Sequence, residues 1–420
     1  MMHISKSKFY TILFAIVLFL QLYLPSFKAN MFIQLGVLSL YFFLEKVTMA
    51  PSFIIRTAPV LFLFLIGFAG AIIHDYEIYN IVKDIFHFSK PVLGLLIGYL
   101  FYKKINDFSV FIKTIVLCGF ASAVIHFVIL IVTADLFSGS IDQIRTFGKD
   151  NFLELFALFF IIYYQKYSLI TLFTSKLMRR IIVFTLLASN ILYFSRTMIV
   201  VAVILFLSCE GYTILTKKTV RFAVVFTTAL LLFYAILFSV KIDRDKPGLE
   251  AFMFKVKIAP AELFKTKIDR ENHKDLWDHW RGYEVKRAYA LMKANPSSFI
   301  FGTGYGSLVN LKFYAPLTGE KNGIKYISEL HNGYMYLFYK TGSIGILILL
   351  FFLLMLYRML YLKDKYRNFV TVFISSIGLL YLFTTLTITG IYNGRDVIIF
   401  ILGALLYFQQ KTTFQKDIVA

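Results

Sequence analysis

The fold of this chain is constrained most by long apolar segments that recur from one end of the sequence to the other. A helix needs about 20 apolar residues to cross the hydrocarbon core of a bilayer. About twelve segments reach or approach that length. They lie at residues 9–24, 31–44, 58–73, 91–102, 108–132, 152–164, 181–194, 198–215, 222–240, 343–362, 369–389 and 397–408. Because backbone polar groups find no water in lipid, we expect helices here and an all-α integral membrane protein.

The composition agrees with this class and excludes others. Hydrophobic residues make up 59% of the 420 positions, charged residues only 16%, and the mean hydropathy is +0.72. A soluble globular protein has a more polar composition than this. The chain carries 44 Lys and Arg against 24 Asp and Glu. In a membrane protein this excess indicates cytoplasmic anchoring and a basic outer loop, so we expect membrane lipids as partners and no nucleic acid.

Basic residues are concentrated in every second connection between the apolar segments. If the N-terminus is cytoplasmic, the connections that face the cytoplasm carry Lys46, Arg56, Lys103, Lys104, Lys166, Lys176, Arg179, Arg180, Lys217, Lys218, Arg221, Arg358, Lys363, Lys365 and Arg367. The short connections on the other side are acidic or mixed, as Asp75 and Glu77 illustrate. Short loops rich in Lys and Arg stay in the cytoplasm, so we predict that both termini lie there.

One connection is much longer than the others and divides the chain into three parts. Residues 241–330 separate the ninth and tenth apolar segments and lie on the outer side in this topology. Connections of this length are usually functional or disordered, and this one has enough aromatic residues and helical periodicity to fold. We therefore expect nine transmembrane helices in 1–240, a large and mostly helical outer loop in 241–330, and three transmembrane helices in 331–420.

The outer loop contains a predicted helix with an arginine on its apolar face. The helical pattern covers 274–294 and is stopped by an Asn-Pro pair, and Arg281 falls among the apolar residues of one face. Such an arginine can extend its guanidinium to water or form a salt bridge, for which Glu284 is near in sequence. The alternative is a guanidinium held inward to bind an anion, and the helix alone favours neither.

Two more arginines and a histidine lie at the same outer boundary. Arg196 interrupts the apolar sequence between the seventh and eighth segments, where a charge indicates either function or contact with lipid headgroups. Arg145 precedes the sixth segment in an otherwise ordinary polar loop. His331 stands beside Asn332 where the outer loop returns to the membrane, and Gly342 beyond it allows close helix packing. A lone histidine is more often structural, but this position favours a functional role.

Three arginines and a histidine at one boundary predict an anionic substrate with a lipid tail. No cluster of His, Cys or carboxylate residues at metal-ligand spacing accompanies them, so we predict no metal. The sequence has no Walker-type phosphate loop, which argues against nucleotide hydrolysis. A transporter for lipid-linked sugars is an alternative class, with Glu154 and His126 as its only candidates inside the apolar segments. A membrane scaffold that binds a partner through the outer loop is a third.

These residues, taken in order, resemble the bacterial O-antigen ligase and O-antigen polymerase superfamily. The resemblance is carried by Arg145-x-x-Gly148-x-x-Asn151, by Ser195-Arg196-Thr197, by Arg281 with Asn295-Pro296 and Gly302-x-Gly304, and by His331-Asn332 with Gly342 and Gly345. It covers about residues 145–362, and the first four helices carry no such signature. Val285 stands where the ligase pattern has Leu, which leaves the helix face intact.

The resemblance implies a metal-independent, inverting glycosyltransferase of the GT-C type in a bacterial inner membrane, with its site facing the periplasm. The donor would be a glycan linked to undecaprenyl pyrophosphate, and no cofactor is implied. Arg196 and Arg281 would bind the pyrophosphate of the donor. His331 would act as general base on the acceptor hydroxyl or orient it, with Arg145 and Asn332 supporting the site.

The resemblance leaves the acceptor open. A ligase transfers its glycan to lipid A-core, whereas a polymerase of O-antigen, capsule or exopolysaccharide transfers it to another lipid-linked repeat unit. About twelve helices with the main loop between the ninth and tenth resemble the ligase layout more closely. We therefore expect a ligase, with the polymerase as the alternative within the superfamily.

Overall fold

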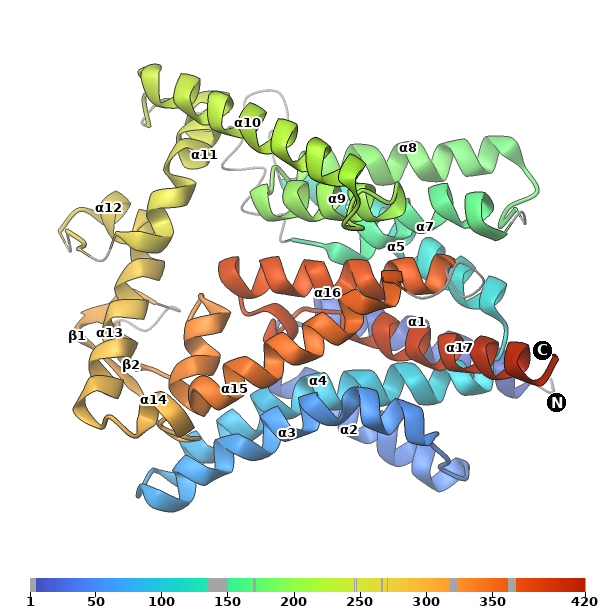
Figure 1. The fold of residues 1–420 in the computed structure, drawn as a ribbon, viewed down its shortest axis with the longest axis horizontal. Coiled ribbons are helices and arrows are strands. Elements are labelled where there is room, and N and C mark those ends of the chain that lie inside the picture. Colours follow the sequence, from blue (N-terminus) through green and yellow to red (C-terminus); the bar gives the residue numbers. More distant parts are fainter. Residues whose placement is uncertain are drawn as a thin grey trace.

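The computed structural model describes residues 5–133, 150–168, 171–244, 246, 248–265, 267–269, 271–317, 323–361 and 368–419. Most of these residues are helical (Figure 1). The helices of the bundle are α1 Lys6–Tyr23, α2 Phe27–Leu44, α3 Pro51–Ile73, α4 Ile78–Ile105, α5 Phe108–Thr133, α7 Phe152–Ser168, α8 Lys176–Leu192, α9 Arg196–Cys209, α10 Lys217–Ser239, α15 Gly333–Tyr357, α16 Phe369–Thr387 and α17 Ile398–Val419.

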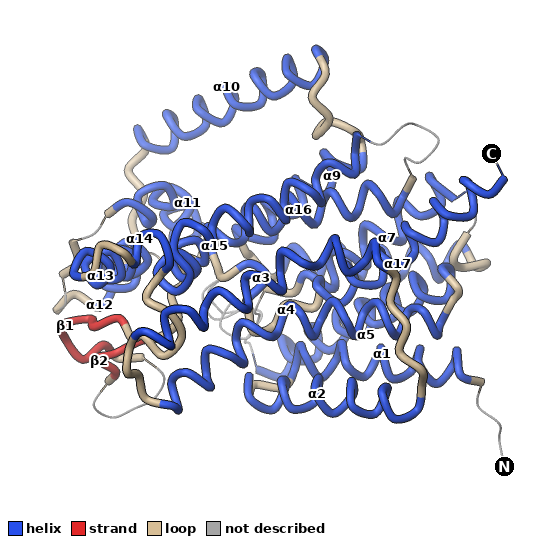
Figure 2. The backbone as a smooth tube through the Cα atoms, turned by 60° about the horizontal axis from the view of Figure 1, so that its bottom comes forward, coloured by secondary structure: helices blue, strands red, loops and turns tan. Residues whose placement is uncertain are grey.

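Each predicted apolar segment coincides with one of these helices, so the prediction of helices is confirmed. Within the described ranges, eight helices are long and apolar enough to cross a membrane, and α9 and the first part of α17 are shorter apolar helices. The chain is therefore a multi-pass membrane protein, while the count of twelve spans stays a prediction. Only 6% of the apolar part of α10 is buried, and Figure 2 shows this helix standing apart from the others.

Close backbone contact at glycines holds the C-terminal helix against the bundle. A side chain at Gly98 of α4 would place its Cβ 2.0 Å from the carbonyl oxygen of Phe400. A side chain at Gly403 of α17 would place its Cβ 2.3 Å from the carbonyl oxygen of Leu95. Because only hydrogen fits at both positions, α4 and α17 approach each other more closely than larger residues allow.

The two ends of the chain lie at the same end of the bundle as several basic connections. Glu45, which follows α2, accepts from Lys6 at 3.1 Å and also from Lys104 at the end of α4. Lys411 of α17 donates to Asn106 at 2.7 Å. The connections predicted to face one side of the membrane are thus neighbours in space.

The long connection lies at the opposite end of the bundle, where its elements gather beyond α3 and α15 (Figure 1). It comprises α11 Leu249–Phe264, α12 His273–Asp278, α13 Trp280–Ala294, α14 Ser298–Phe301 and an antiparallel pair of strands, β1 Val309–Ala315 and β2 Ile324–Ile327. The hairpin was not predicted, although residues 309–313 of β1 alternate between apolar and polar, because β2 has only four residues and repeats no such pattern.

The predicted helix 274–294 is wrong in one respect, since the chain breaks at His279 between α12 and α13. The break allows residues of both helices to enter a small core against the hairpin. This core consists of Leu276, Trp280, Tyr283, Leu311 and Ala315. On its other face, α13 buries Ala288 and Met292 in the main core of the bundle. The helix that carries Arg281 is therefore fixed between two cores, and it ends before Asn295 as predicted.

Candidate functional site

Two predicted site residues, Arg196 and Arg281, meet at one carboxylate. Nη1 and Nη2 of Arg196 both lie 3.1 Å from Oε1 of Glu262, a residue of α11. Nη1 of Arg281 lies 2.8 Å from Oε2 of the same carboxylate. Hydrogen bonds between guanidinium and carboxylate groups are charge-assisted and among the strongest in proteins. We call Arg196, Arg281 and Glu262 the arginine side of the site.

Local structure fixes each member of the arginine side. Arg196 is the first residue of α9, and the hydroxyl of Ser195 caps this helix by accepting from the backbone N–H of Met198 at 3.2 Å. Next to Arg281, a side chain at Gly282 would place its Cβ 2.2 Å from the carbonyl oxygen of Lys265. Glycine thus lets the start of α13 lie directly against the end of α11, which brings Glu262 to both arginines.

The third predicted residue, His331, is held by a second carboxylate. Nδ1 of His331 lies 3.0 Å from Oε1 of Glu284, and the backbone N–H of His331 donates to Oε2 at 2.9 Å. Nε1 of Trp280 donates to Oε1 of Glu284 at 2.6 Å. An ionised carboxylate only accepts hydrogen bonds, so Nδ1 carries the proton and Nε2 keeps its lone pair in the neutral ring. We call His331, Glu284 and Trp280 the histidine side.

Helix α13 joins the two sides, because Arg281 and Glu284 are three residues apart and share a face of the helix. The sequence offered Glu284 as a salt-bridge partner for Arg281, and this interpretation is wrong. Arg281 pairs with Glu262 instead, and Glu284 binds His331. The structure therefore brings Arg196, Arg281 and His331 into one connected group of side chains. Sequence reasoning missed the role of both carboxylates.

Asn332, a further predicted residue, begins α15. Its side-chain oxygen accepts from the backbone N–H of Met335 at 3.0 Å, so it caps the helix directly after His331. Asn332 also lies at an open groove of about 560 Å³. The groove is lined by Val285, Asn332, Tyr334, Met335, Phe338, Ser343, Ile346 and Leu347. Asn332 and Val285 therefore place this mostly apolar groove next to His331 and one helical turn after Arg281.

Arg145, the last predicted residue, lies outside the described residues, as does Gly148 of the same motif. Asn151 of this motif is described and buried. Its oxygen accepts from the backbone N–H of Glu154 at 3.3 Å, so Asn151 caps α7. Its side-chain N–H groups donate to Ser122 at 2.7 Å and to the Glu154 carboxylate at 2.9 Å.

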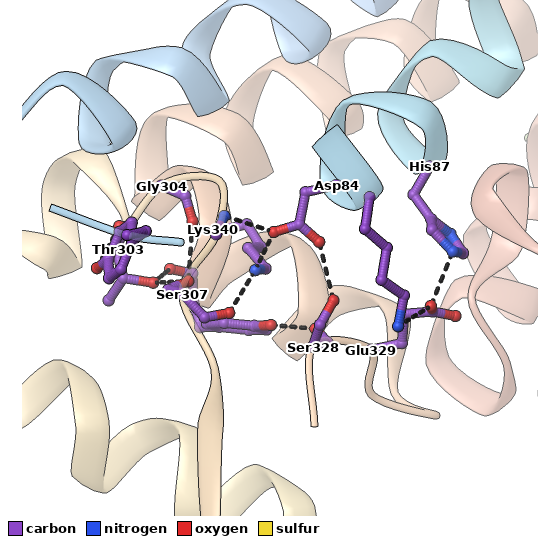
Figure 3. A network of polar contacts seen from close by, with 12 residues as sticks. Asp84, His87, Thr303, Gly304, Ser307, Ser328, Glu329 and Lys340 are labelled. Carbon is purple, nitrogen blue, oxygen red and sulfur yellow. Dashed lines mark hydrogen bonds and ion pairs between the residues drawn. The ribbon is translucent and has the colours of Figure 1, made fainter. Parts of the chain in front are cut away.

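A buried polar network fixes the segment that leads to His331 (Figure 3). Asp84 of α4 accepts from Lys340 of α15, and both side chains are fully buried. The same carboxylate accepts from the hydroxyl of Ser328 at 2.8 Å and from the backbone N–H of Gly306 at 2.8 Å. It therefore ties α4, α15, the glycine-rich turn at residues 302–306 and the segment before His331 together at one point.

Sequence reasoning overlooked this network, although a signal was available. Asp84 and Lys340 precede the predicted apolar segments 91–102 and 343–362, but the structure includes them in the membrane-length helices α4 and α15. A charged residue in such a helix requires a partner of opposite charge, so Asp84 and Lys340 could have been predicted to form an ion pair. The predicted role of Gly342 is confirmed: at φ +68 it lets α15 bend where the carbonyl oxygen of Ile300 approaches.

Glu329 provides a second anchor two residues before His331. Its carboxylate lies 2.7 Å from Nε2 of His87 and 3.4 Å from Nζ of Lys83, both on α4 (Figure 3). Burial alone would raise the pKa of Glu329, but the hydrogen bond from His87 and the charge of Lys83 outweigh it and lower the pKa to about 2. The carboxylate is therefore ionised throughout the physiological range and binds the segment to α4.

Among the residues that the structure describes, no group of three or more His, Cys, Asp or Glu side chains is arranged to hold a metal ion. The expectation of a metal-independent reaction stays a prediction.

Comparison with known proteins finds a family model that matches part of the chain. Residues 181–350 match the family model described as O-Antigen ligase, a range that includes Arg196, Arg281 and His331. A search of curated proteins found no match. Members of the matched family are glycosyltransferase-like enzymes, and the family implies lipid-linked glycan substrates. The predicted resemblance to the O-antigen ligase and O-antigen polymerase superfamily is thereby confirmed for residues 181–350.

Proposed function

We propose that the chain is a glycosyltransferase of O-antigen ligase type. It moves a glycan from undecaprenyl pyrophosphate to lipid A-core at the periplasmic face of a bacterial inner membrane, and both of its termini are cytoplasmic. The observation that carries this proposal is the joining of two arginines and one histidine through α13. This arrangement offers guanidinium groups to an anion and an imidazole to a hydroxyl at neighbouring positions.

The arginine side would bind the pyrophosphate of the donor. Guanidinium groups stay charged at all relevant pH values, and their planar arrangement of N–H groups matches phosphate oxygens. Arg196 also begins α9, where the helix dipole favours negative charge. Fixed positive groups of this kind stabilise the charge that develops on the pyrophosphate as it leaves. Arg145, at the start of the family motif, is proposed to support the same task.

The histidine side would activate the acceptor. Since Glu284 engages Nδ1, Nε2 of His331 is the ring nitrogen that can take the proton of the acceptor hydroxyl. The acceptor oxygen forms a bond to the anomeric carbon while the bond from this carbon to the pyrophosphate oxygen breaks. Undecaprenyl pyrophosphate leaves, and the proton passes to Nε2. Attack opposite the leaving group inverts the anomeric configuration, and the donor bond supplies the energy without a metal ion or cofactor.

The apolar groove that begins beside Asn332 supports a lipid-linked substrate. Val285 in its wall is one helical turn from Arg281, and Asn332 is the neighbour of His331. A chain of isoprene units bound there would hold its headgroup at the boundary where the charged residues lie. Asn332 thus supports the site by starting α15 between the groove and His331.

The test is glycan transfer by the purified full-length protein in lipid nanodiscs. The donor is a glycan on undecaprenyl pyrophosphate, and the acceptor is either lipid A-core or a second lipid-linked repeat unit. We expect the glycan to appear on lipid A-core. Extension of the lipid-linked unit instead would establish a polymerase, and movement of the donor across the bilayer without any new glycosidic bond would contradict a transferase.

Cells that lack the chain separate the same alternatives. Loss of a ligase leaves finished polymer on undecaprenyl pyrophosphate. Loss of a polymerase leaves single repeat units attached to the core. Analysis of the surface glycans and of the extracted lipid-linked glycans distinguishes the two results.

A further inference from the structure

The place between Arg196 and Arg281 is already occupied by an anion of the protein itself. Glu262 lies in bonding distance of both guanidinium groups, and its side chain is only 10% exposed. The arginine side chains are 25% and 31% exposed, so they remain open to a ligand. A donor pyrophosphate would therefore meet two guanidinium groups whose charge Glu262 has already neutralised in part.

The Glu262 carboxylate does not pair every N–H group of these two arginines. Nε of Arg281 is buried and has no hydrogen-bond partner among the described residues. A buried N–H without a partner is energetically unfavourable, so this donor requires a further acceptor. One carboxylate offers two oxygens and one charge. A pyrophosphate diester offers two charges and more acceptor oxygens, so it can satisfy N–H groups that Glu262 leaves unpaired.

The position of Glu262 allows it to withdraw without disrupting the fold. It lies in the last turn of α11, two residues after Pro260, which has no backbone N–H to stabilise the helix there. The close contact between Gly282 and Lys265 holds the end of α11 in place, so rotation of the Glu262 side chain is sufficient.

We propose that Glu262 is an internal competitor for the donor: it binds Arg196 and Arg281 between turnovers, yields them to lipid-linked pyrophosphate, and rebinds them as the pyrophosphate lipid leaves. This inference rests on the proposed function. Exchange of one anion for another keeps the guanidinium groups paired at every stage, which avoids unpaired charge in a partly buried site. It also weakens the binding of undecaprenyl pyrophosphate as a product, so release does not limit turnover.

The test compares Glu262→Gln with wild-type protein in nanodiscs, using undecaprenyl pyrophosphate as the ligand. The amide keeps the shape of the side chain but loses its charge. We expect about tenfold tighter binding, equal to roughly 1.4 kcal/mol, together with stronger product inhibition and a first turnover of normal rate. The control is Glu250→Gln, the same charge change on the same helix at a residue that bonds Asp243 and Lys246 and not the arginines. Its affinity should equal that of the wild type.

Equal or weaker binding by Glu262→Gln would overturn the inference, because Glu262 would then position the arginines instead of competing for them. Should the amide variant fail to fold, Glu262→Asp decides the question: a shortened carboxylate competes less well and should bind the ligand more tightly than the wild type. If wild-type protein bound undecaprenyl pyrophosphate no better than undecaprenol, the donor in the proposed function would be wrong, and the inference would fail with it.

Discussion

The histidine side and the arginine side each contain a carboxylate, and the two carboxylates differ in surroundings. Glu284 is 1% exposed and accepts from Trp280 and from both the backbone and the ring of His331, whose own side chain is 55% exposed. Glu262 binds two permanently charged groups and leaves one buried N–H of Arg281 unpaired. Both oxygens of Glu284 are hydrogen-bonded and orient His331, whereas Glu262 does not pair every N–H group of its two arginines.

This difference corresponds to the two tasks of a glycan transfer. A general base must be held in one tautomer and one orientation, which requires fixed and saturated hydrogen bonds. A donor site must bind and release a charged lipid in each turnover, which requires contacts that can be exchanged. The predictions below test this contrast between a fixed histidine side and an exchangeable arginine side.

Replacement of His331 should have the largest effect. In His331→Ala no ring nitrogen remains to accept the hydroxyl proton, so we expect the rate of glycan transfer to fall about 10³-fold with donor binding unchanged. The measurement is initial rate in nanodiscs, with His74→Ala at the same end of the bundle as the control. Transfer at the normal rate by His331→Ala would remove the histidine from the mechanism.

The next effect should come from Glu284→Gln. The amide has one oxygen acceptor where the carboxylate has two, so it cannot accept all the hydrogen bonds of Trp280 and His331. The imidazole then loses its fixed tautomer, and we expect kcat to fall about 10²-fold. The KM for the donor should stay the same. A variant whose KM rises while kcat is retained would show that Glu284 serves the arginine side.

Arg196→Lys should have a smaller effect, confined to the donor. Lysine keeps the charge but loses the planar pair of N–H groups, so we expect the KM for the donor to rise about tenfold while kcat changes little. Arg221→Lys on the exposed face of α10 is the matched control. Unchanged donor affinity in Arg196→Lys would indicate that this arginine only anchors the helix.

The smallest effect should appear in the pH dependence of stability at Glu329. Its pKa is lowered to about 2 in the folded chain, so its contribution to stability is complete above its ordinary pKa of 4.5 and is lost as the pH falls toward 2. We expect the melting temperature of Glu329→Gln to lie below that of the wild type by a few degrees at about pH 6. This difference should shrink between about pH 4.5 and 3, whereas a constant difference would contradict the ion pair as its source.

Sequence patterns predicted the parts of this protein that depend on local order. The apolar segments predicted the helices of the bundle, the Asn-Pro pair predicted the end of α13, and the position of His331 before Asn332 predicted a loop returning to a helix. Arg196 and His331 were found because a charged or polar residue at the edge of an apolar segment is unusual. Arg281 was found because it interrupts the apolar face of a predicted helix.

The partners of these residues were not predictable, because they depend on tertiary contacts. Glu262 lies in a part of the outer loop where charged residues are frequent, and nothing in its spacing distinguishes it from its neighbours. Glu284 was noticed only as a neighbour of Arg281 on the helix, since its contact with His331 spans 47 residues. The Asp84–Lys340 pair could have been suspected from two charges in apolar helices, but its connection to Ser328 could not.

The measurement that tests the histidine side most directly is a double-mutant cycle between His331 and Glu284 in the transfer assay. Glu284 acts on the reaction only through His331, so the double variant with His331→Ala and Glu284→Gln should transfer glycan at the same residual rate as His331→Ala alone. A further loss of about 10²-fold in the double variant would mean that the two residues act independently. The carboxylate would then have a role other than orienting the histidine.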